Sequence, residues 1–305
     1  MADAELRIIC GPTAAGKSEL AMRLAERFGG LIIGADSRQI YRGFDIGTAK
    51  PTVADRRRVP HRGIDLVDPT ERYSAAAWAE GARQWIREAA AQSRTPVVVG
   101  GSGFYVRGLI DPLFREPPLD PARRAALQAE LDALPTEELR RWCDRFDPSR
   151  AHLGRTQLLR ALEIALLTGV PISVWHQRSG QSPALDARYL LLDPGRALQQ
   201  RIVERIRVML AAGWIDEVRA LAERVPPGAS AWNATGYRAV LELVRGHRST
   251  EAAIERITID TRQYAKRQRT WFRHQLPVHS VTVLDPTSPH AERAAAHWWE
   301  ARGSA

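Results

Sequence analysis

"LRIICGPTAAGKS", residues 6–18, joins a short apolar run to a glycine-containing loop. The loop has the spacing Gly11, four residues, then Gly16-Lys17-Ser18. Between a strand and a helix this spacing is typical of a phosphate-binding loop, because backbone N–H groups at the helix N-terminus converge on phosphate oxygens. The lysine adds positive charge, and the serine hydroxyl can contact Mg²⁺. The sequence therefore predicts a site for a diphosphate or triphosphate group and leaves its chemistry open.

Short apolar runs alternate with helical stretches up to about residue 112. Residues 6–10, 30–36 and 95–101 are continuous apolar runs, which indicate parallel strands covered on both faces. Residues 18–28 and 75–91 have the periodicity of helices that cover such a sheet. We therefore predict an α/β fold with a parallel sheet core like that of P-loop NTPases.

The sequence changes character after residue 112. Residues 113–187 consist mainly of charged helical stretches, which predict an all-helical insertion domain. Strand-like residues return at 188–193 and again within 278–285, and a long helix is expected from about 196 to 212. We expect the α/β core to comprise residues 1–112 and 188–305.

Composition limits the classes of protein that fit. The 305 residues are 44% hydrophobic, which suits a globular protein with one large core or two smaller ones. No signal peptide or membrane span is predicted, and the two cysteines, Cys10 and Cys143, are far apart in sequence. We expect a cytoplasmic monomer without disulfides. The net charge of +9 fits either a polyanionic partner or a solvated basic surface.

Three classes of protein could carry such a loop. A regulatory GTPase is excluded because it needs an Asn-Lys-x-Asp segment, and the sole asparagine here is Asn233. A small-metabolite kinase stays open, because Asp36 follows an apolar run as an Mg²⁺-associated aspartate would. A basic binding module is the third class. Asp36 itself has a second interpretation, as the N-cap of a helix over the residues that follow it.

Several long strings resemble bacterial tRNA dimethylallyltransferases, a prenyl-transferring family with a P-loop core. They are "GADSRQIYRGFDIGTAKP" at 34–51, "VGGSGFYVRGL" at 99–109, "LRALEIALLTGVPIS" at 159–173, "RIVERIRVMLAAGWIDEVRAL" at 201–221 and "TRQYAKRQRTWFRHQ" at 261–275. The resemblance covers nearly the whole chain. It implies that dimethylallyl diphosphate is the donor and that the exocyclic amine of adenine 37, beside the tRNA anticodon, is the acceptor.

The resemblance also implies where the diphosphate binds. The residues concerned are Gly11, Pro12, Thr13, Ala14, Ala15, Gly16, Lys17, Ser18 and Arg205. Mg²⁺ would be held through Ser18, partly by way of water and the diphosphate itself. Arg201 lies four residues before Arg205 on the same helix face, and spacing alone assigns it to a solvated basic face.

Catalysis is assigned to Asp36, Thr13, Lys17 and Arg205. Cations around the diphosphate stabilise the charge that grows on it as the allylic C–O bond breaks. The adenine amine is a weak nucleophile, and Asp36 is expected to accept its proton. Thr13 is expected to hydrogen-bond in the same region, although its hydroxyl could equally satisfy the local backbone.

Contacts to tRNA are expected in the core and in the insertion. The expected residues are Asp36, Ser37, Arg38, Gln39, Ser102, Gly103, Arg124, Gln157, Arg160, Arg262, Lys266, Arg267 and Arg269. Gln157 stands where the family pattern commonly has arginine, so the phosphate contact at that position is in doubt.

The last basic segment, residues 261–284, has no acidic residue and interleaves its cations with aromatic rings. This composition is typical of RNA contacts. For Trp271, packing on the core is favoured over stacking on a base. The net charge and this segment argue against the two alternative functions, a small-metabolite kinase and an isopentenyltransferase that acts on a free adenylate.

Overall fold

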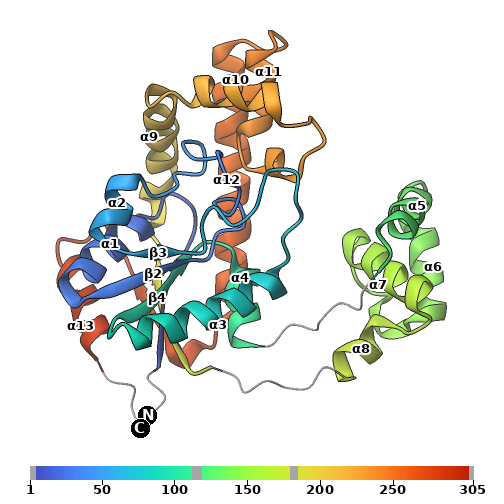
Figure 1. The fold of residues 1–305 in the computed structure, drawn as a ribbon, viewed down its shortest axis with the longest axis horizontal. Helices are drawn as coiled ribbons and strands as arrows, with labels where there is room; N and C mark the ends of the chain where they lie inside the picture. Colours follow the sequence, from blue (N-terminus) through green and yellow to red (C-terminus); the bar gives the residue numbers. More distant parts are fainter. Residues whose placement is uncertain (1–4, 112–118, 179–184, 302–305) are drawn as a thin grey trace. The chain divides into compact units, whose positions relative to one another are not determined.

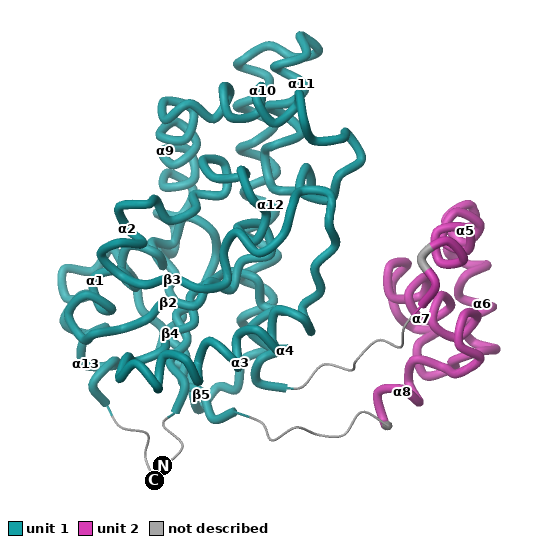
Figure 2. The backbone as a smooth tube through the Cα atoms, in the orientation of Figure 1, with its two compact units in different colours: residues 1–111, 184–305 teal, residues 112–183 magenta. Residues whose placement is uncertain are grey.

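The computed structural model describes residues 5–111, 119–178 and 185–301, which form two compact units (Figure 2). The core unit comprises Met1–Asp111 and Ala184–Ala305, and the helical unit comprises Pro112–Pro183. The sequence places Ala187 in the insertion, but it is the first residue of a strand of the core sheet.

The core unit is built on six parallel strands in the order β3-β2-β4-β1-β5-β6. The strands are β1 (Leu6–Cys10), β2 (Gly30–Gly34), β3 (His61–Arg62), β4 (Thr95–Gly100), β5 (Ala187–Leu192) and β6 (Val281–Leu284). The predicted α/β fold with a parallel sheet is confirmed. The sequence pattern missed β3, because two residues are too few to show a strand periodicity.

Register brings the loops after β1 and β4 together. Cys10 pairs with both Gly100 and Leu191, so β1 ends level with its two neighbours. Gly11 has φ 140°, and a Cβ at this position would lie 2.3 Å from the carbonyl oxygen of Leu192. Only glycine allows that backbone approach. The chain leaves β1 where its path along the sheet reverses, the place at which doubly wound sheets bind ligands.

Helices cover both faces of the sheet (Figure 1). On one face, α1 (Lys17–Phe28) and α13 (Ala291–Glu300) pack with Ile9, Val97 and Leu190 in one apolar cluster. On the other, α3 (Ala75–Ala91) and α4 (Gly103–Ile110) pack together, with Trp78 stacked on Tyr105 at 4.9 Å between ring centroids. Two covered faces explain why the strands are continuous apolar runs.

Further helices of the core unit extend beyond the sheet (Figure 1). They are α2 (Val53–Arg58), α9 (Leu198–Ala211), α10 (Trp214–Arg224), α11 (Tyr237–Val244) and the 26-residue α12 (Thr250–Gln275). The helix that we predicted from residue 196 begins at Leu198, after a 3₁₀ turn over Gly195–Ala197. An aromatic cluster that includes Phe44, Trp214 and Tyr237 anchors α10 and α11 to the segment after β2.

The helical unit has its own core. It contains α5 (Pro121–Asp132), α6 (Thr136–Phe146), α7 (Arg155–Thr168) and α8 (Ile172–Arg178). Leu139, Leu158 and Leu162 are fully buried between these helices. Among the described residues of the whole chain, no helix is both long and apolar enough to cross a membrane.

Candidate active site

The loop between β1 and α1 has the backbone of an anion site. Gly16 at φ 91° and Ala14 at φ 62° adopt left-handed conformations, which turn successive N–H groups toward one side. The loop runs directly into the N-terminus of α1, whose dipole favours negative charge. Lys17 Nζ donates a hydrogen bond to the carbonyl oxygen of Pro12, 2.7 Å away, so the ammonium group folds back over the loop.

The charge on Lys17 is costly in the free protein. Burial, and next the positive charge of Arg205, lower its pKa to about 8, although the Asp36 carboxylate opposes the shift. Burial likewise lowers the pKa of Arg205. Among the described residues, no carboxylate lies within ion-pair distance of either cation. Two cations held close together without a counterion favour the binding of an anion.

Two arginines one helical turn apart on α9 face the loop. Arg201 Nε donates to the carbonyl oxygen of Ala14 at 2.9 Å, and its guanidinium lies beside Gly16. Arg205 lines the adjoining pockets with Thr13 and Asp36. Our assignment of Arg201 to a solvated face is therefore wrong. Spacing placed both arginines on one helix face, but only the tertiary structure shows that this face meets the loop.

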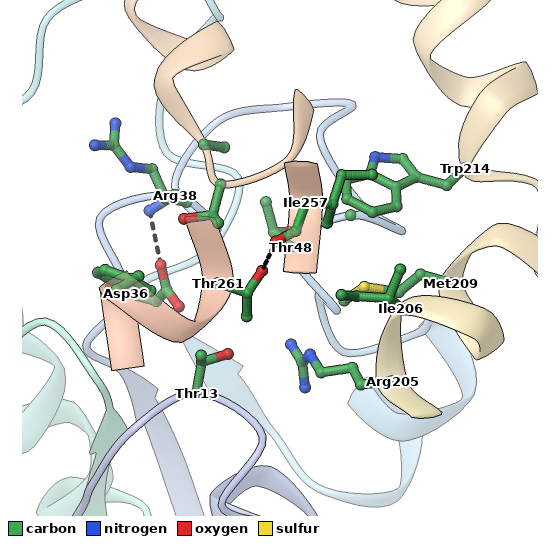
Figure 3. Close-up of a pocket in the computed structure, with 14 residues that line it drawn as sticks. Thr13, Asp36, Arg38, Thr48, Arg205, Ile206, Met209, Trp214, Ile257 and Thr261 are labelled. Carbon is green, nitrogen blue, oxygen red and sulfur yellow. Dashed lines mark hydrogen bonds between the residues drawn. The ribbon is translucent and has the colours of Figure 1, made fainter. Parts of the chain in front are cut away.

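Asp36 follows β2 and faces the loop across a pocket. Its Oδ1 accepts a hydrogen bond from the backbone N–H of Arg38, 2.8 Å away, and no helix begins there. The N-cap interpretation of Asp36 is therefore wrong, because the carboxylate closes a turn instead. Figure 3 shows the carboxylate of Asp36, the hydroxyl of Thr13 and the guanidinium of Arg205 around one space, while the side chain of Arg38 extends away from it.

The walls of this space differ in polarity. Two pockets, with empty volumes of about 560 and 1350 Å³ including space open to solvent, share Thr13, Asp36, Thr48, Arg205 and Tyr264. The smaller one continues between the apolar side chains of Ile206, Met209, Trp214 and Ile257 (Figure 3). The larger one is lined by the loop residues Thr13, Ala14, Gly16, Lys17 and Ser18. The site therefore joins an anion-binding half to an apolar half, with a carboxylate between them.

Residues that we expect to contact tRNA lie next to Asp36. The N–H of Ser37 donates to Ser102 Oγ at 3.0 Å, so the loops after β2 and β4 meet there. Gln39 Nε2 donates to the carbonyl oxygens of Thr48 and Ala49, at 3.0 and 3.1 Å, and holds that segment at the pocket. A Cβ on Gly103 would lie 2.2 Å from the ring of Trp271. This close contact supports our interpretation that Trp271 packs on the protein.

Helix α12 presents two different faces. Thr261, Tyr264 and Gln268 line the pockets, and burial, with the Asp36 carboxylate as the next cause, raises the pKa of Tyr264 to about 12. Arg262 and Lys266 are exposed on the other side of the helix, as is Arg267, whose guanidinium lies over the Tyr264 ring. Arg269 instead pairs with Asp193 and donates to the carbonyl oxygen of Gly195 at 2.7 Å.

The helical unit holds the other expected tRNA contacts. Glu163, 2% exposed, accepts hydrogen bonds of 2.5 Å from both Arg124 Nε and Arg160 Nη1. Burial would raise the pKa of Glu163, but these two arginines outweigh it and keep the pKa below its ordinary value. Gln157 is exposed on α7, about one helical turn before Arg160. Arg155, two residues before Gln157, does not replace the missing arginine, since its guanidinium donates to the carbonyl oxygens of Asp132 and Leu134.

Sequence reasoning missed several residues that line the site. They are Thr48, Arg201, Trp214, Thr261, Tyr264 and Gln268. The one available signal was the helical spacing of 257, 261, 264 and 268, which puts these positions on a single face of α12. Nothing local distinguishes such a face from an ordinary core stripe.

The donor set around the loop suits a cation that is shared with a phosphorylated ligand. Among the described residues, no group of three or more His, Cys, Asp or Glu side chains could hold a metal ion alone. Ser18 is exposed at the start of α1 and lines the larger pocket. A hydroxyl there could supply one oxygen ligand, and a Mg²⁺ ion in such sites keeps waters and ligand oxygens for the rest.

The fold and the site define an α/β protein with a parallel sheet, in which the glycine-containing loop after β1 faces a carboxylate and an apolar pocket. The family model "IPP transferase" matches residues 39–275, and the model "Isopentenyl transferase" matches residues 4–61. The chain belongs to the IPP transferase family.

Named relatives extend this similarity over the chain. A tRNA dimethylallyltransferase of Anaeromyxobacter sp. strain K is 40% identical over 300 residues, which cover 93% of this chain and 98% of the relative. One from Halorhodospira halophila is 45% identical over 276 residues, 88% of this chain and 89% of the relative.

Solved structures of the same family are similar to this chain over most of its length. The full-length tRNA isopentenylpyrophosphate transferase of Bacillus halodurans has a TM-score of 0.68 at 32% identity, covering 97% of this chain and 95% of its own. A eukaryotic dimethylallyltransferase acting on tRNA has a TM-score of 0.81 at 26% identity, and the match covers 97% of this chain and 77% of the eukaryotic one.

Proposed function

We propose that this chain is a tRNA dimethylallyltransferase, which transfers a dimethylallyl group from dimethylallyl diphosphate to the exocyclic amine of adenine 37 in tRNA and releases diphosphate. The observation that carries the proposal is the pair Lys17 and Arg205, which share a pocket with Asp36 and have no carboxylate at ion-pair distance among the residues that the structure describes. The names and structures of the relatives support the same reaction.

The loop and its cations act on the leaving group. As the allylic C–O bond of the donor breaks, its electron pair passes to the bridging oxygen and negative charge grows on the diphosphate. Lys17, Arg205 and the loop N–H groups stabilise that charge more strongly than they stabilise the intact donor. Arg201, already bonded to Ala14, supports the loop and adds a further positive charge beside it. The phosphoryl groups stay intact, so the loop serves a leaving group and no phosphate is transferred.

Asp36 acts on the acceptor. The adenine amine forms its new bond to the allylic carbon as the C–O bond breaks, and it must lose one proton. Asp36 Oδ2 is the carboxylate oxygen that makes no hydrogen bond within the described chain, while Oδ1 is held by Arg38 N–H. A carboxylate with one oxygen fixed and the other directed to the pocket is well suited to orient the amine and accept its proton. Thr13 offers a hydroxyl to the same space.

The apolar half of the site favours the donor's hydrocarbon part and the base over water. Ile206, Met209 and Trp214 are buried beside Arg205, so they exclude water from the reacting carbon. A base within a tRNA loop must leave its stack to reach such a pocket, as in other enzymes that modify bases. Exposed cations on α12 and residues of the helical unit would then hold the tRNA backbone.

A divalent cation fits this proposal. Ser18 is the side chain that would hold Mg²⁺, with water and the diphosphate supplying the other oxygens. When bound, the ion would add positive charge beside the leaving diphosphate. A tRNA substrate puts the enzyme in the cytoplasm under this proposal, and the monomer that we expect from the sequence stays a prediction.

Product analysis tests the proposal directly. The protein is incubated with Mg²⁺, dimethylallyl diphosphate and an unmodified tRNA transcript that carries adenine 37, and the nucleosides are analysed by mass. We expect dimethylallyl adenosine in this tRNA and none in a matched transcript with guanine 37. Prenylated free adenylate would support the isopentenyltransferase alternative. ATP-dependent phosphorylation of a small metabolite, with no prenylated nucleoside, would support the kinase.

A further inference from the structure

We infer that Gln268 is a positioning residue that holds the Gly11–Ser18 loop in its anion-binding conformation from the inner face of α12. Its carboxamide Oε1 accepts a hydrogen bond from the backbone N–H of Thr13 at 2.8 Å. Its Nε2 donates to the carbonyl oxygen of Gly101 at 2.9 Å. Gln268 is 6% exposed, so both polar atoms depend on these two partners.

These two bonds join loops that come from different strands. Thr13 follows β1 and Gly101 follows β4, and the amide side chain offers an acceptor to the first and a donor to the second. A Cβ on Gly101 would lie 2.3 Å from Gln268 Nε2, so the glycine allows the amide to reach between the loops. Gln268 therefore sets the distance between the diphosphate loop and the loop that carries Ser102.

The bond to Thr13 lies next to a strained residue. Ala14 has φ 62°, a left-handed conformation that a residue with a Cβ adopts only when its surroundings impose it. Gln268 holds the N–H of Thr13 on one side of Ala14, and Arg201 holds the carbonyl oxygen of Ala14 on the other, at 2.9 Å. Without these restraints, the loop is expected to relax and to move its N–H groups away from the diphosphate.

Both ends of the Gln268 amide are engaged by the two loops. Oε1 accepts a hydrogen bond from Thr13 N–H, and one of the two N–H groups of Nε2 donates to Gly101. These two bonds assign Gln268 a positioning role. The Thr13 N–H is also used by Gln268, so the phosphate-binding amides lie further along the loop. The helix that we expect to bind tRNA on its outer face thus supports the diphosphate loop with its inner face.

Gln268→Met tests the role, since methionine has a similar length and neither hydrogen-bonding group. We expect inorganic pyrophosphate, the probe in calorimetry, to bind about 10-fold more weakly. Single-turnover dimethylallyl transfer at saturating donor and tRNA should slow by about 10-fold or more, while tRNA affinity stays within about 2-fold. Gln268→Glu keeps the acceptor for Thr13 N–H, loses the donor to Gly101 and adds a negative charge beside the loop, so it should bind pyrophosphate at least as weakly as Gln268→Met.

Two variants on the same helix control for indirect effects. Gln263→Met makes the same chemical change at an exposed position and should leave pyrophosphate affinity unchanged. Ala253→Gly destabilises the same helix at a buried position that has no bond to either loop. It therefore shows what a loss of thermal stability alone does to pyrophosphate affinity.

The kinetic part of this inference rests on the proposed function, whereas the pyrophosphate measurement does not. Weak pyrophosphate binding by Gln268→Met would uphold the positioning role even if the parent protein prenylated no tRNA. Parental pyrophosphate affinity in Gln268→Met would overturn it. So would an equal loss of affinity in Ala253→Gly, because the effect would then follow helix stability alone.

Discussion

The loop site and the helical unit both hold cations that the sequence assigns to a polyanion, but they treat these charges in opposite ways. In the helical unit, Arg124 and Arg160 share the buried carboxylate of Glu163, at 2.5 Å each. In the loop site, Lys17 and Arg205 have no carboxylate at ion-pair distance among the described residues, and burial lowers the pKa of each. The paired arginines of the helical unit are expected to stabilise the fold, because removing their carboxylate would leave buried charges without a partner. The two unpaired cations of the loop site repel each other, so they favour the binding of an anion.

The comparison assigns different roles to basic residues that the sequence alone does not distinguish. Removing a loop cation should damage binding of the donor and the chemical step with little effect on folding. Removing the carboxylate of the helical unit should instead damage folding. A charge on the open face of α12, which is neither buried nor paired, should affect only tRNA binding and its dependence on salt.

The largest effect is expected for Lys17→Met. Loss of a preorganised charge at the leaving group should slow single-turnover transfer by about 10² to 10³-fold at saturating donor. Weaker donor binding should accompany the slower step. Rapid-quench measurements over a range of donor concentrations separate the two effects. Full recovery of the rate at high donor concentration would make Lys17 a binding residue only.

Asp36→Asn is expected to slow the chemical step by about 10²-fold. The asparagine side chain keeps an oxygen for the N–H of Arg38, so the turn and the shape of the pocket should persist. Affinities for tRNA and donor should therefore stay close to those of the parent. If the variant and the parent have equal single-turnover rates, Asp36 only closes its turn.

Glu163→Gln should destabilise the helical unit by about 1 to 2 kcal/mol, because two arginines lose a charged acceptor. Hydrogen exchange or limited proteolysis of α5 to α7 measures this. The lowered pKa of Glu163 means that its ionised form stabilises the fold above its ordinary pKa of 4.5, and that this contribution is lost as the pH falls through the folded-state pKa. Stability equal to the parent's at neutral pH would show that the fold does not depend on the charge that Glu163 offers to the two arginines.

The outer face of α12 should contribute to tRNA affinity through phosphate contacts. The double variant Arg262→Gln with Lys266→Gln should reduce the salt slope of tRNA binding by about 0.7 to 0.9 per lost contact, with the chemical step unchanged. Arg256→Gln is the matched control, since Arg256 lies on the same helix but is paired with Asp260 at 3.0 Å. A parental slope in a double variant that melts like the parent would remove this face from the tRNA site.

The smallest expected effect is a proton taken up when the donor binds. Lys17 has a pKa of about 8 in the free protein, and a bound diphosphate raises it. Between pH 8 and 9, a growing share of Lys17 is neutral before binding and protonated after it, so donor affinity should fall as the pH rises. Calorimetry in buffers of different ionisation enthalpy measures the uptake. The uptake should be smaller in Lys17→Met, and an identical value in both proteins would contradict the proposed environment of Lys17.

The fold was largely readable from the sequence, for a local reason. Buried parallel strands are continuous apolar runs, and each run is followed by a helix with its own periodicity, so β1, β4 and α3 were predicted to the residue or within one residue. The strand β3 has two residues and forms only because Ile32 and Ile33 offer it partners. Such an element exists through its neighbours and leaves no local pattern.

The residues of the site also differ in whether local sequence could identify them. Lys17 and Ser18 are fixed by a loop motif, and Asp36 by the end of a strand, so local sequence could locate them. Arg201 and Gln268 act on the loop from helices about 190 and 250 residues further along the chain, and their roles depend on tertiary contacts. The resemblance to a known family supplied Arg205, which spacing alone did not distinguish from Arg201.

One matched pair of variants on α9 tests the central claim that an unpaired cation at the loop drives departure of the diphosphate. Arg205→Met removes the pocket arginine, and Arg207→Met removes an exposed arginine two residues on that lies beside Glu204, at 3.8 Å. Single-turnover dimethylallyl transfer is measured for both at saturating donor and tRNA. We predict a rate about 10²-fold or more below the parent's for Arg205→Met and a parental rate for Arg207→Met. Equal, parental rates in both variants would contradict the claim.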